Sequence, residues 1–518
     1  MHRLMVKTLP RFNNPIWFPI FMGSLLRLIN IQAPIVGVHS WRQADTAAMA
    51  RHFFLENTPI WLPQIDWAGA SEGYVECEFP LFPYLVGQLY KVFGLHEWIG
   101  RGLSLIFSVI SIFLIIRIGS ELFDRVSGWW GGLFFALLPL NVYYGRTFQA
   151  ESLLILLAIL SIYSLYLWKR NANPWTLFVS WISFCLACLL KLLPFIWLGL
   201  PLLIIQAYGG GDQSKISLRE LSRRVVRSLL SPGVLVYGLS ALLLVSIWFL
   251  YSYKLGSESG FSFFIWGKNT DRVSIDMLLN LQVWSNLLLR ILLRNLALVG
   301  LPLLIIGLFS SSSQLTLGSS LKAGLVGMFI CTTLAMRSSS VHEYYQLPLQ
   351  IFFCPFMGHG WHVLINHDSI KRISNYLFFS LLILITSISV AILYIDYFSV
   401  ESNQEEIWMP LATKVRNEVK PNSRVISVTG LDPTLLNLMR RQGWLTSVSN
   451  LNEENIKNWK LKGATHIVGS LNWQETYIRL SNDDVNDLKM KLSCEVESSF
   501  CPRPPHYTYF VPIEKITN

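Results

Sequence analysis

Long apolar segments recur along residues 1–398 and are separated by polar loops. Most of these segments have roughly the 17–25 residues that an α-helix needs to cross a lipid bilayer. The pattern predicts about eleven membrane-spanning helices, at residues 15–35, 98–119, 127–146, 149–168, 174–190, 192–208, 232–253, 288–309, 323–337, 345–364 and 375–398.

The pattern changes in residues 399–518, where short apolar runs alternate with charged segments. These runs predict strands at 424–430, 465–470 and 507–513 and helices at 432–444, 452–464 and 482–492. Gly443 is the expected stop of the first of these helices. The fold class expected is a polytopic α-helical membrane protein with about 11–13 spans in residues 1–398, followed by a C-terminal extracytoplasmic α/β domain in residues 399–518.

Composition supports this division. Of 518 residues, 52% are hydrophobic and only 14% are charged, against about 25% charged in soluble domains. This excludes a disordered chain, a disulfide scaffold and a typical cytosolic enzyme. The net charge is +10, and residues 399–518 contain 14 basic and 14 acidic residues, so the whole excess lies in residues 1–398. With no nucleic-acid-binding motif beside it, this excess indicates membrane topology rather than a nucleic-acid partner.

The distribution of basic residues sets the expected topology, because lysine and arginine collect in cytoplasmic loops. With a cytoplasmic N-terminus, the basic loops that contain Arg125, Lys169–Arg170, residues 215–227, Lys322 and Lys371–Arg372 all fall inside. An odd number of spans then places residues 399–518 outside. The expected location is the inner (plasma) membrane of a bacterium, with the lipid bilayer as the surrounding medium.

Ionisable and aromatic residues gather in the segments that this topology places outside. The first external loop, residues 36–97, contains Arg42, Asp45 and Glu78. The remaining members lie where later spans begin or end at the same face: Arg146, Glu151, Lys191, His342, Glu343 and Tyr345. Boundary charges without a common role would fall on both faces. Since a charge beside a span is costly, their shared location indicates a functional site.

The residue types in this group suit a substrate with a lipid tail, a phosphate and a polar head. Asp45 and Glu151 are candidate general bases if burial raises their pKa values. Arg42, Arg146 and Lys191 are candidate ligands of an anion. Glu78, His342, Glu343 and Tyr345 complete the candidate substrate-binding set. The segment 40–54 is expected to be a short amphipathic helix lying in the membrane interface.

Ordinary structural roles remain open for the same residues. Asp45 and Arg42 could form a surface ion pair, and Glu151 could offset a helix dipole. Lys191 could extend to the lipid headgroups, and His342 could be a satisfied interfacial histidine. No cofactor is required, and no metal-motif spacing supports the remaining alternative, a divalent metal held by His39, His52, Glu78 and His342.

Four segments together resemble a known family. They are HSWRQADTAAMARHF (39–53), EFPLFPYLVGQLYKVFG (78–94), YYGRTFQAESLLILL (143–157) and HEYYQLPL (342–349). They look like bacterial family 39 glycosyltransferases of the GT-C superfamily, which includes protein O-mannosyltransferases and the aminoarabinose transferases of lipid A. The resemblance covers residues 1–398, and the tail is similar to that of some bacterial members.

The resemblance implies an inverting transferase that uses a polyprenyl-phosphate-linked sugar donor and a lipid, glycan or protein acceptor. Asp45 matches the catalytic base of the family, and Glu151 matches its second acid. The family often has a lysine after the acid of the second motif, whereas here Phe79–Pro80 follows Glu78. Without a nucleotide diphosphate in the donor, a divalent ion is not demanded.

Rival functions are another lipid-linked transferase and, from a different class, a transporter or flippase of lipid-linked sugars. A transporter is expected to have charges or broken helices near the midplane and internal repeats. The sequence has no Walker motif and no tandem repeat. Cys494 and Cys501 could pair if the tail lies in an oxidising compartment.

Overall fold

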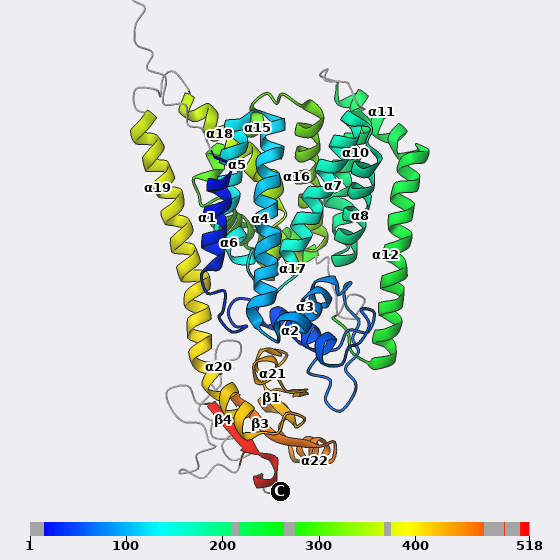
Figure 1. The fold of residues 1–518 in the computed structure, drawn as a ribbon, viewed down its shortest axis with the longest axis vertical. Coiled ribbons are helices and arrows are strands. Elements are labelled where there is room, and N and C mark those ends of the chain that lie inside the picture. Colours follow the sequence, from blue (N-terminus) through cyan, green and yellow to red (C-terminus); the bar gives the residue numbers. More distant parts are fainter. Residues whose placement is uncertain are drawn as a thin grey trace, which may run out of the picture.

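A computed structural model describes residues 15–208, 217–263, 275–366, 374–470, 492 and 508–516. Figure 1 shows a bundle of roughly parallel helices with a small sheet beyond one end. Helices α2 (Ser40–Leu55) and α3 (Leu81–Phe93) lie across that end of the bundle, between it and the sheet. We call this the α2 end, and the opposite end is called the far end.

Each predicted span is helical in the structure. The helices of the bundle are α1 (Trp17–Leu28), α4 (Glu97–Leu122), α5 (Arg125–Leu137), α6 (Pro139–Tyr144), α7 (Glu151–Asn171), α8 (Pro174–Leu190), α9 (Pro194–Trp197), α10 (Gly199–Tyr208), α12 (Pro232–Ser259), α14 (Leu281–Arg290), η1 (Ile291–Asn295), α15 (Gly300–Phe309), α16 (Leu315–Leu334), α18 (Leu349–Asn366) and α19 (Ser374–Ile392). Shorter helices join them: α11 (Leu218–Leu229), α13 (Ile275–Leu279), α17 (Met336–Val341) and η2 (Glu343–Gln346). The expected polytopic fold is therefore confirmed as a helix-rich membrane fold.

The number of unbroken long spans is smaller than the apolar segments suggest. Among the described residues, five helices are long and apolar enough to cross a membrane, or six if one bent pair counts as a span. Several other apolar helices, α1 and α8 among them, have fewer than 18 residues. A helix packed inside protein can be shorter than one surrounded by lipid, because neighbouring helices cover its ends.

Two predicted spans need correction. Residues 288–309 do not form one straight helix, because α14–η1 and α15 meet at an angle of 91°. Ala297 and Leu298 have φ values of 45° and 57°, and this left-handed backbone ends the first helix. The span predicted at 323–337 is α16, which begins at Leu315. Its polar first turns fit because they face protein, where the Ser320 hydroxyl donates to the Pro201 carbonyl at 3.1 Å.

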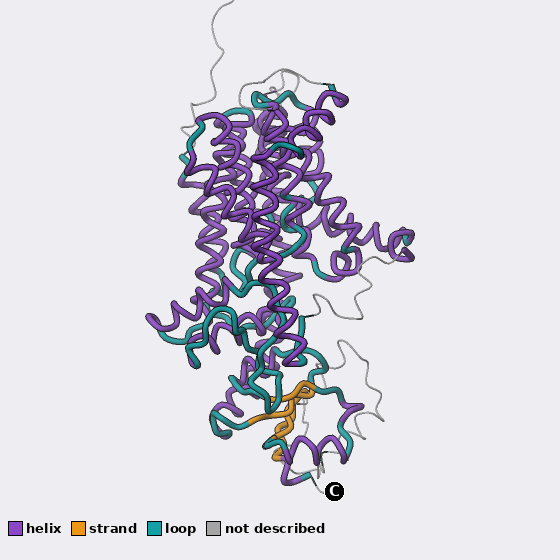
Figure 2. Tube along the Cα trace, turned by 90° about the vertical axis from the view of Figure 1, so that its right-hand side faces the viewer, coloured by secondary structure: helices purple, strands orange, loops and turns teal. Residues whose placement is uncertain are grey.

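The tail is a four-stranded sheet joined to the bundle by a helix. The strands are β1 (Arg424–Val428), β2 (Gly443–Leu445), β3 (Ala464–Ser470) and β4 (Thr508–Pro512), in the order β2-β1-β3-β4. β1 is parallel to β2 and β3, and β4 is antiparallel to β3. Figure 2 shows these strands beyond the α2 end. The α/β character expected for the tail is confirmed.

Details of the tail differ from the prediction. The helix expected at 432–444 is the shorter α21 (Thr434–Met439), because Arg440 is left-handed, and Gly443 begins β2 instead of ending a helix. The other tail helices are α22 (Glu453–Leu461) and α20 (Ser399–Glu418), with single turns at η4 (Val448–Asn450) and η5 (Ile513–Lys515). The predicted helix 482–492 and both tail cysteines, Cys494 and Cys501, lie outside the described residues apart from residue 492.

The boundary between bundle and tail falls within a helix. α19, η3 (Leu393–Phe398) and α20 form one continuous helix, and the 40 residues Phe379–Glu418 of it make up one candidate membrane span. The apolar part of this helix belongs to the bundle, and its polar end carries the sheet. A change from apolar to polar side chains at residue 398 therefore marks the boundary between bundle and tail, while the backbone stays helical.

Candidate active site

Asp45 lies on α2, and this helix is buried on most of its surface. α2 packs against α3 on one side and against α21 of the tail on another. Most of its residues are buried, among them Gln43, Ala44 and Ala48. The helix expected at 40–54 is confirmed, but it is not an amphipathic helix exposed in the interface, because the tail covers the face that water would otherwise contact.

The Asp45 carboxyl group is held in a defined orientation with one oxygen free. Its side chain is almost fully buried, and the Trp67 indole donates a hydrogen bond to Oδ1 at 3.0 Å. Among the described residues, Oδ2 takes part in no hydrogen bond. Burial raises the pKa of Asp45 to about 8, although the Trp67 hydrogen bond and the Arg42 charge oppose the rise. A carboxylate of this kind binds a proton near neutral pH, as a general base must.

Glu78 forms an ion pair with Arg42. The two side chains are 2.5 Å apart, and the Arg42 guanidinium also lies 5.2 Å from the centre of the Phe263 ring. Burial alone would raise the pKa of Glu78, but the Arg42 charge lowers it below its usual value. The backbone before Glu78 is fixed, because the Cys77 amide donates to the Ser252 hydroxyl at 2.9 Å. Arg42 therefore pairs with Glu78 in place of Asp45.

Glu151 and Lys191 form a second ion pair at the α2 end. The Lys191 Nζ atom is 2.8 Å from Glu151 and lies 4.6 Å and 4.9 Å from the ring centres of Tyr344 and Tyr345. Glu151 occupies the first turn of α7, where a carboxylate offsets the helix dipole. Lys191 follows the last residue of α8 in extended backbone, and Pro194 prevents the helix from continuing.

His342 lies in an aromatic cluster beside Lys191. Its ring stacks on Tyr344 and Tyr345, with ring centres 5.4 Å and 6.3 Å apart, and the Trp41 ring is 5.6 Å away. Burial, followed by the charges of Lys191 and other nearby cations, lowers the pKa of His342 to about 4. The ring is therefore neutral at pH 7. Its buried Nδ1 atom has no hydrogen-bond partner among the described residues.

A small pocket lies next to this cluster. Lys191, Tyr344 and Tyr345 line it together with side chains that are largely apolar: Leu154, Leu193, Trp197, Met328, Cys331, Thr332, Ser339 and Pro348. The pocket therefore combines apolar side chains with one cation and two aromatic rings. Such a surface suits an apolar chain attached to an anion.

Arg146 and Glu343, which were predicted to bind the substrate, form ion pairs with other residues instead. The buried Arg146 pairs with Glu401 of α20 at 2.7 Å, and its guanidinium lies 5.4 Å from the centre of the Tyr143 ring. Glu343 accepts a hydrogen bond from the Tyr144 hydroxyl at 3.0 Å and pairs with Arg294. Both side chains join elements of the scaffold. Their contacts do not include the group formed by Lys191, Glu151 and His342.

Sequence reasoning missed three residues at this site. Trp67 orients Asp45 but has no motif around it. Arg290 donates to the carbonyl groups of Ser339 and Ser340 at 3.3 Å and 3.0 Å, and its charge lowers the pKa of His342. Arg290 was assigned to a predicted span at 288–309, although an arginine at the start of a span was itself a signal.

The third missed residue is Asp432, from the tail. It follows β1 at the carboxyl end of the parallel strands, where ligand-binding residues of α/β folds commonly lie. Burial raises the pKa of Asp432 to about 6, and its negative charge is one of the influences that raise the pKa of Asp45. The two carboxyl groups therefore lie close enough to interact electrostatically. The sequence of the tail alone gave no indication of this approach.

The tail is hydrogen-bonded directly to the segment between α2 and α3 and to the start of α2. The Gly69 amide donates to the Gly443 carbonyl at 2.7 Å, and the Gly443 amide donates to the Asp66 carbonyl at 2.8 Å. The Thr434 hydroxyl donates to the Ser40 hydroxyl at the start of α2, at 3.0 Å. The sheet is thus a fixed cover on the α2 end.

Comparison with known proteins shows which fold the chain shares. Residues 78–250 match the family model of dolichyl-phosphate-mannose-protein mannosyltransferases. No curated protein matches the sequence. The fold matches ArnT from Cupriavidus metallidurans in the apo state, with a TM-score of 0.61 and 14% identity over 97% of this chain and 99% of that chain.

Two further structures share the fold. ArnT from the same organism bound to undecaprenyl phosphate gives a TM-score of 0.60 at 13% identity, over 96% of this chain and 98% of that one. The oligosaccharyltransferase of Archaeoglobus fulgidus in complex with zinc and sulfate gives 0.57 at 11% identity, over 92% and 70%. The expected resemblance to GT-C glycosyltransferases is confirmed. The chain is a membrane protein with the GT-C glycosyltransferase fold.

Proposed function

We propose that this chain transfers a sugar from a polyprenyl-phosphate-linked donor to a hydroxyl group of a lipid, glycan or protein acceptor, with inversion at the anomeric carbon. The observation that supports it best is the mostly apolar pocket that Lys191, Tyr344 and Tyr345 help to line. An isoprenoid chain matches the apolar side chains, and a phosphate matches the cation. ArnT has been solved with undecaprenyl phosphate and AglB from Archaeoglobus fulgidus with dolichol phosphate.

In this proposal Lys191 and Arg42 stabilise the phosphate of the donor. Each is paired with a carboxylate, Lys191 with Glu151 and Arg42 with Glu78. The two carboxylates hold the cations in place before the donor arrives, and the phosphate then shares them. Arg290 is a third cation, and no carboxylate lies within ion-pair distance of it in the part of the chain that the structure describes. Negative charge that grows on the leaving phosphate is stabilised by such a fixed group of cations.

Asp45 is the proposed general base. Its free Oδ2 atom accepts the proton of the acceptor hydroxyl while the oxygen of that hydroxyl forms a bond to the anomeric carbon. The bond between this carbon and the phosphate oxygen breaks on the opposite face, which inverts the configuration. If the acceptor is already an ionised phosphate, Asp45 positions it instead of deprotonating it. Trp67 keeps the carboxyl group in place through Oδ1.

The neutral ring of His342 and the indole of Trp41 are proposed to contact the sugar. The Nδ1 atom of His342 is buried and without a partner among the described residues, and a sugar hydroxyl would satisfy it. Aromatic faces also pack well against sugar rings. Glu343 and Arg146, which bind scaffold groups, contribute to the shape of the site and are not proposed to touch the donor.

The proposed orientation places the α2 end and the tail outside the bacterial inner membrane. The far end carries Arg125, the first residue of α5, and Lys169 in the last turn of α7, and such residues collect in cytoplasmic loops. The tail then covers the external site and contributes to the choice of acceptor. Divalent metal is not proposed as a requirement at Asp45, because a monophosphate leaving group can be stabilised by lysine and arginine.

The test uses purified protein in nanodiscs with a panel of polyprenyl-phosphate sugars and mixed lipid, glycan and peptide acceptors. Release of polyprenyl phosphate and formation of product are followed by mass spectrometry. Asp45→Asn is expected to lower turnover by about 10²–10⁴-fold, the usual contribution of a general base, while donor binding persists. Asp276→Asn, exposed on α13, is the matched control.

Two outcomes would contradict the proposal. Full turnover by Asp45→Asn would remove Asp45 as the base. Movement of intact lipid-linked sugar across the bilayer of proteoliposomes, without release of polyprenyl phosphate under any acceptor, would favour a flippase.

A further inference from the structure

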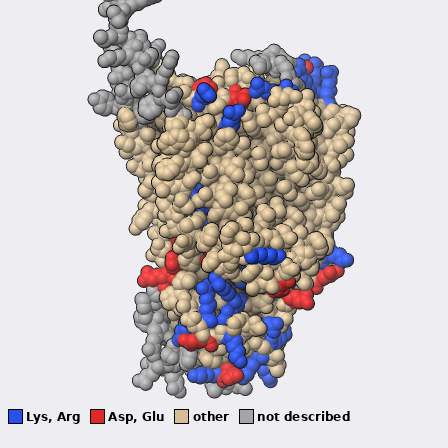
Figure 3. All heavy atoms as spheres, in the orientation of Figure 1, with Lys and Arg blue, Asp and Glu red and all other residues tan. Residues whose placement is uncertain are grey.

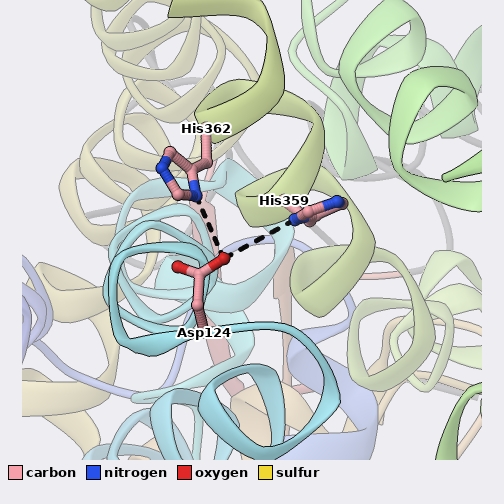
Figure 4. A group of neighbouring side chains, drawn as sticks. All are labelled: Asp124, His359 and His362. Carbon is pink, nitrogen blue, oxygen red and sulfur yellow. Dashed lines mark hydrogen bonds and ion pairs between the residues drawn. The ribbon is translucent and has the colours of Figure 1, made fainter. Parts of the chain in front are cut away.

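A second cluster of polar side chains lies at the far end, away from the proposed active site (Figure 4). Asp124 joins α4 to α5, and His359 and His362 are three residues apart on the same face of α18. The side chains are 40%, 14% and 27% exposed, respectively. Among the described residues, they form the one group of three histidine, cysteine or acidic side chains that is compact enough to hold a metal ion.

The two oxygen atoms of the Asp124 carboxyl group have different partners. Oδ1 accepts hydrogen bonds from the amides of Val126 and Ser127, both at 2.9 Å, and so caps the start of α5. Oδ2 faces the histidines, 3.1 Å from Nδ1 of His362 and 4.0 Å from Nδ1 of His359. The cap thus fixes the carboxyl group with one oxygen directed at two imidazole nitrogens.

The Ser127 hydroxyl completes a four-atom group. Its Oγ atom is 2.9 Å from Oδ2 of Asp124, 3.0 Å from Nδ1 of His359 and 3.3 Å from Nδ1 of His362. A tetrahedral zinc ion with bonds of about 2.0–2.1 Å requires its ligands to be about 3.4 Å apart. The separations to Ser127 and the contact between Asp124 and His362 are close to that value, so small side-chain rotations would suffice.

We propose that Asp124, His359 and His362 bind a zinc ion at the far end, with the Ser127 hydroxyl or a water molecule as the fourth ligand. Imidazole nitrogen and carboxylate oxygen are ligands that zinc accepts. The site tethers the α4–α5 turn to α18, and the Phe123 ring stacks on His359 at 3.8 Å and fixes its plane. This role is structural, is separate from the transfer chemistry, and does not depend on the proposed function.

The test measures metal retained by the full chain, purified in nanodiscs with an affinity tag that contains no histidine. After EDTA treatment and removal of the chelator, the protein is loaded with zinc sulfate and desalted, and metal is counted by mass spectrometry. Wild type is expected to keep about one more zinc ion per chain than His359→Ala/His362→Ala, since one four-ligand site is removed. His342→Ala, which alters the histidine cluster at the α2 end, is expected to retain this ion.

Asp124→Asn separates the metal site from the helix cap. Asparagine also caps helices well, so the variant keeps its fold, but it replaces a charged ligand with a neutral one. Its zinc affinity is expected to fall by at least about 10–100-fold, the loss seen when only outer-shell partners are changed. Cobalt loading gives a second readout, since wild type is expected to show the visible absorption of a four-coordinate site and Asp124→Asn to lose it.

Equal zinc retention and equal cobalt spectra in wild type, Asp124→Asn and the double variant would overturn the proposal. The cluster would then be a hydrogen-bonded link between α5 and α18. If the double variant does not fold, the comparison between wild type and Asp124→Asn decides the question.

Discussion

The ion pairs at the two ends of the helix bundle differ in how deeply they are buried. At the α2 end the ion pairs Glu151–Lys191 and Arg146–Glu401 are largely or fully buried. At the far end the Glu121–Arg170 pair is solvated, with side chains 26% and 45% exposed. Figure 3 shows charged side chains at both ends and a broad middle surface almost without them. Charge alone therefore does not distinguish the ends, whereas its burial does.

Burial of a charged group costs free energy, so each buried charge needs a structural or functional explanation. Taking a carboxylate or ammonium group out of water costs several kcal/mol, about as much as its partner returns. The far end avoids this cost by leaving its basic residues exposed, which is sufficient for setting topology. At the α2 end, Asp45, Glu151 and Lys191 are buried despite this cost. Their burial raises the pKa of Asp45 and keeps the cations in fixed positions. Five predictions test this difference.

The largest effect on stability is expected from Glu401→Gln. This buried side chain pairs with Arg146 at 2.7 Å and with Arg101 at 3.7 Å. Its loss leaves two arginines buried without a counter-charge and is expected to lower the free energy of unfolding by about 3–5 kcal/mol. Thermal unfolding in detergent measures the loss. The exposed Glu405→Gln on the same helix is the control, and equal melting temperatures would show that the pair is not structural.

The next effect concerns donor binding at the second buried pair. Lys191→Met/Glu151→Gln removes both charges, so no unpaired carboxylate remains. Its affinity for a polyprenyl-phosphate sugar is expected to fall by about 10–100-fold, in line with the loss of about 1.5–3 kcal/mol for a charged hydrogen bond. Tryptophan fluorescence titration measures the dissociation constant. Unchanged affinity for the phosphate-bearing lipid, with the pocket intact, would exclude Lys191 as a phosphate ligand.

A smaller and graded effect is expected from pH. Burial raises the pKa of Asp45 from 3.8 to about 8, so the ionised base becomes more abundant as pH rises from 6 to 9. Below the pKa, kcat/KM is expected to fall about tenfold per pH unit if this ionisation limits the rate. Trp67→Phe removes a hydrogen bond that favours the charged form, so the profile should move to higher pH. A flat wild-type profile would contradict this assignment.

The same pKa makes a prediction for stability. Between pH 4 and pH 8 the folded protein holds a proton on Asp45 that the unfolded chain has released. Stability from this group is therefore present below pH 4 and is lost as pH rises to 8. Asp45→Asn, which stays neutral, should have a higher melting temperature than wild type at pH 9 and a similar one at pH 4. The opposite order would mean that the Asp45 charge is stabilised in the fold.

The smallest effect is expected at the far end. Glu121→Gln breaks the Glu121–Arg170 pair, and because both partners are partly solvated the cost should be about 0–1 kcal/mol. Melting temperature and donor turnover should both stay close to wild type. A loss comparable to that of Glu401→Gln would remove the distinction between the two ends.

The sequence by itself determined the apolar and polar pattern. It located helices at all eleven predicted spans, the α/β character of the tail and the α2 helix around Asp45. These features follow from local periodicity and from the length that a bilayer requires, so they need no knowledge of distant contacts. The resemblance to GT-C glycosyltransferases also came from short motifs, and it was confirmed by the family model and the shared fold.

Only the tertiary structure decided which charged groups meet. Arg146 was grouped with Lys191 on charge alone, yet it pairs with Glu401, which is 255 residues away in the sequence. Trp67 and Asp432 approach Asp45 although neither belongs to a motif, and the bend at Ala297–Leu298 interrupts an apolar run that appeared continuous. Partner choice depends on packing between distant segments, and residue type fixes only the sign of a charge, so no local pattern could have assigned these pairs.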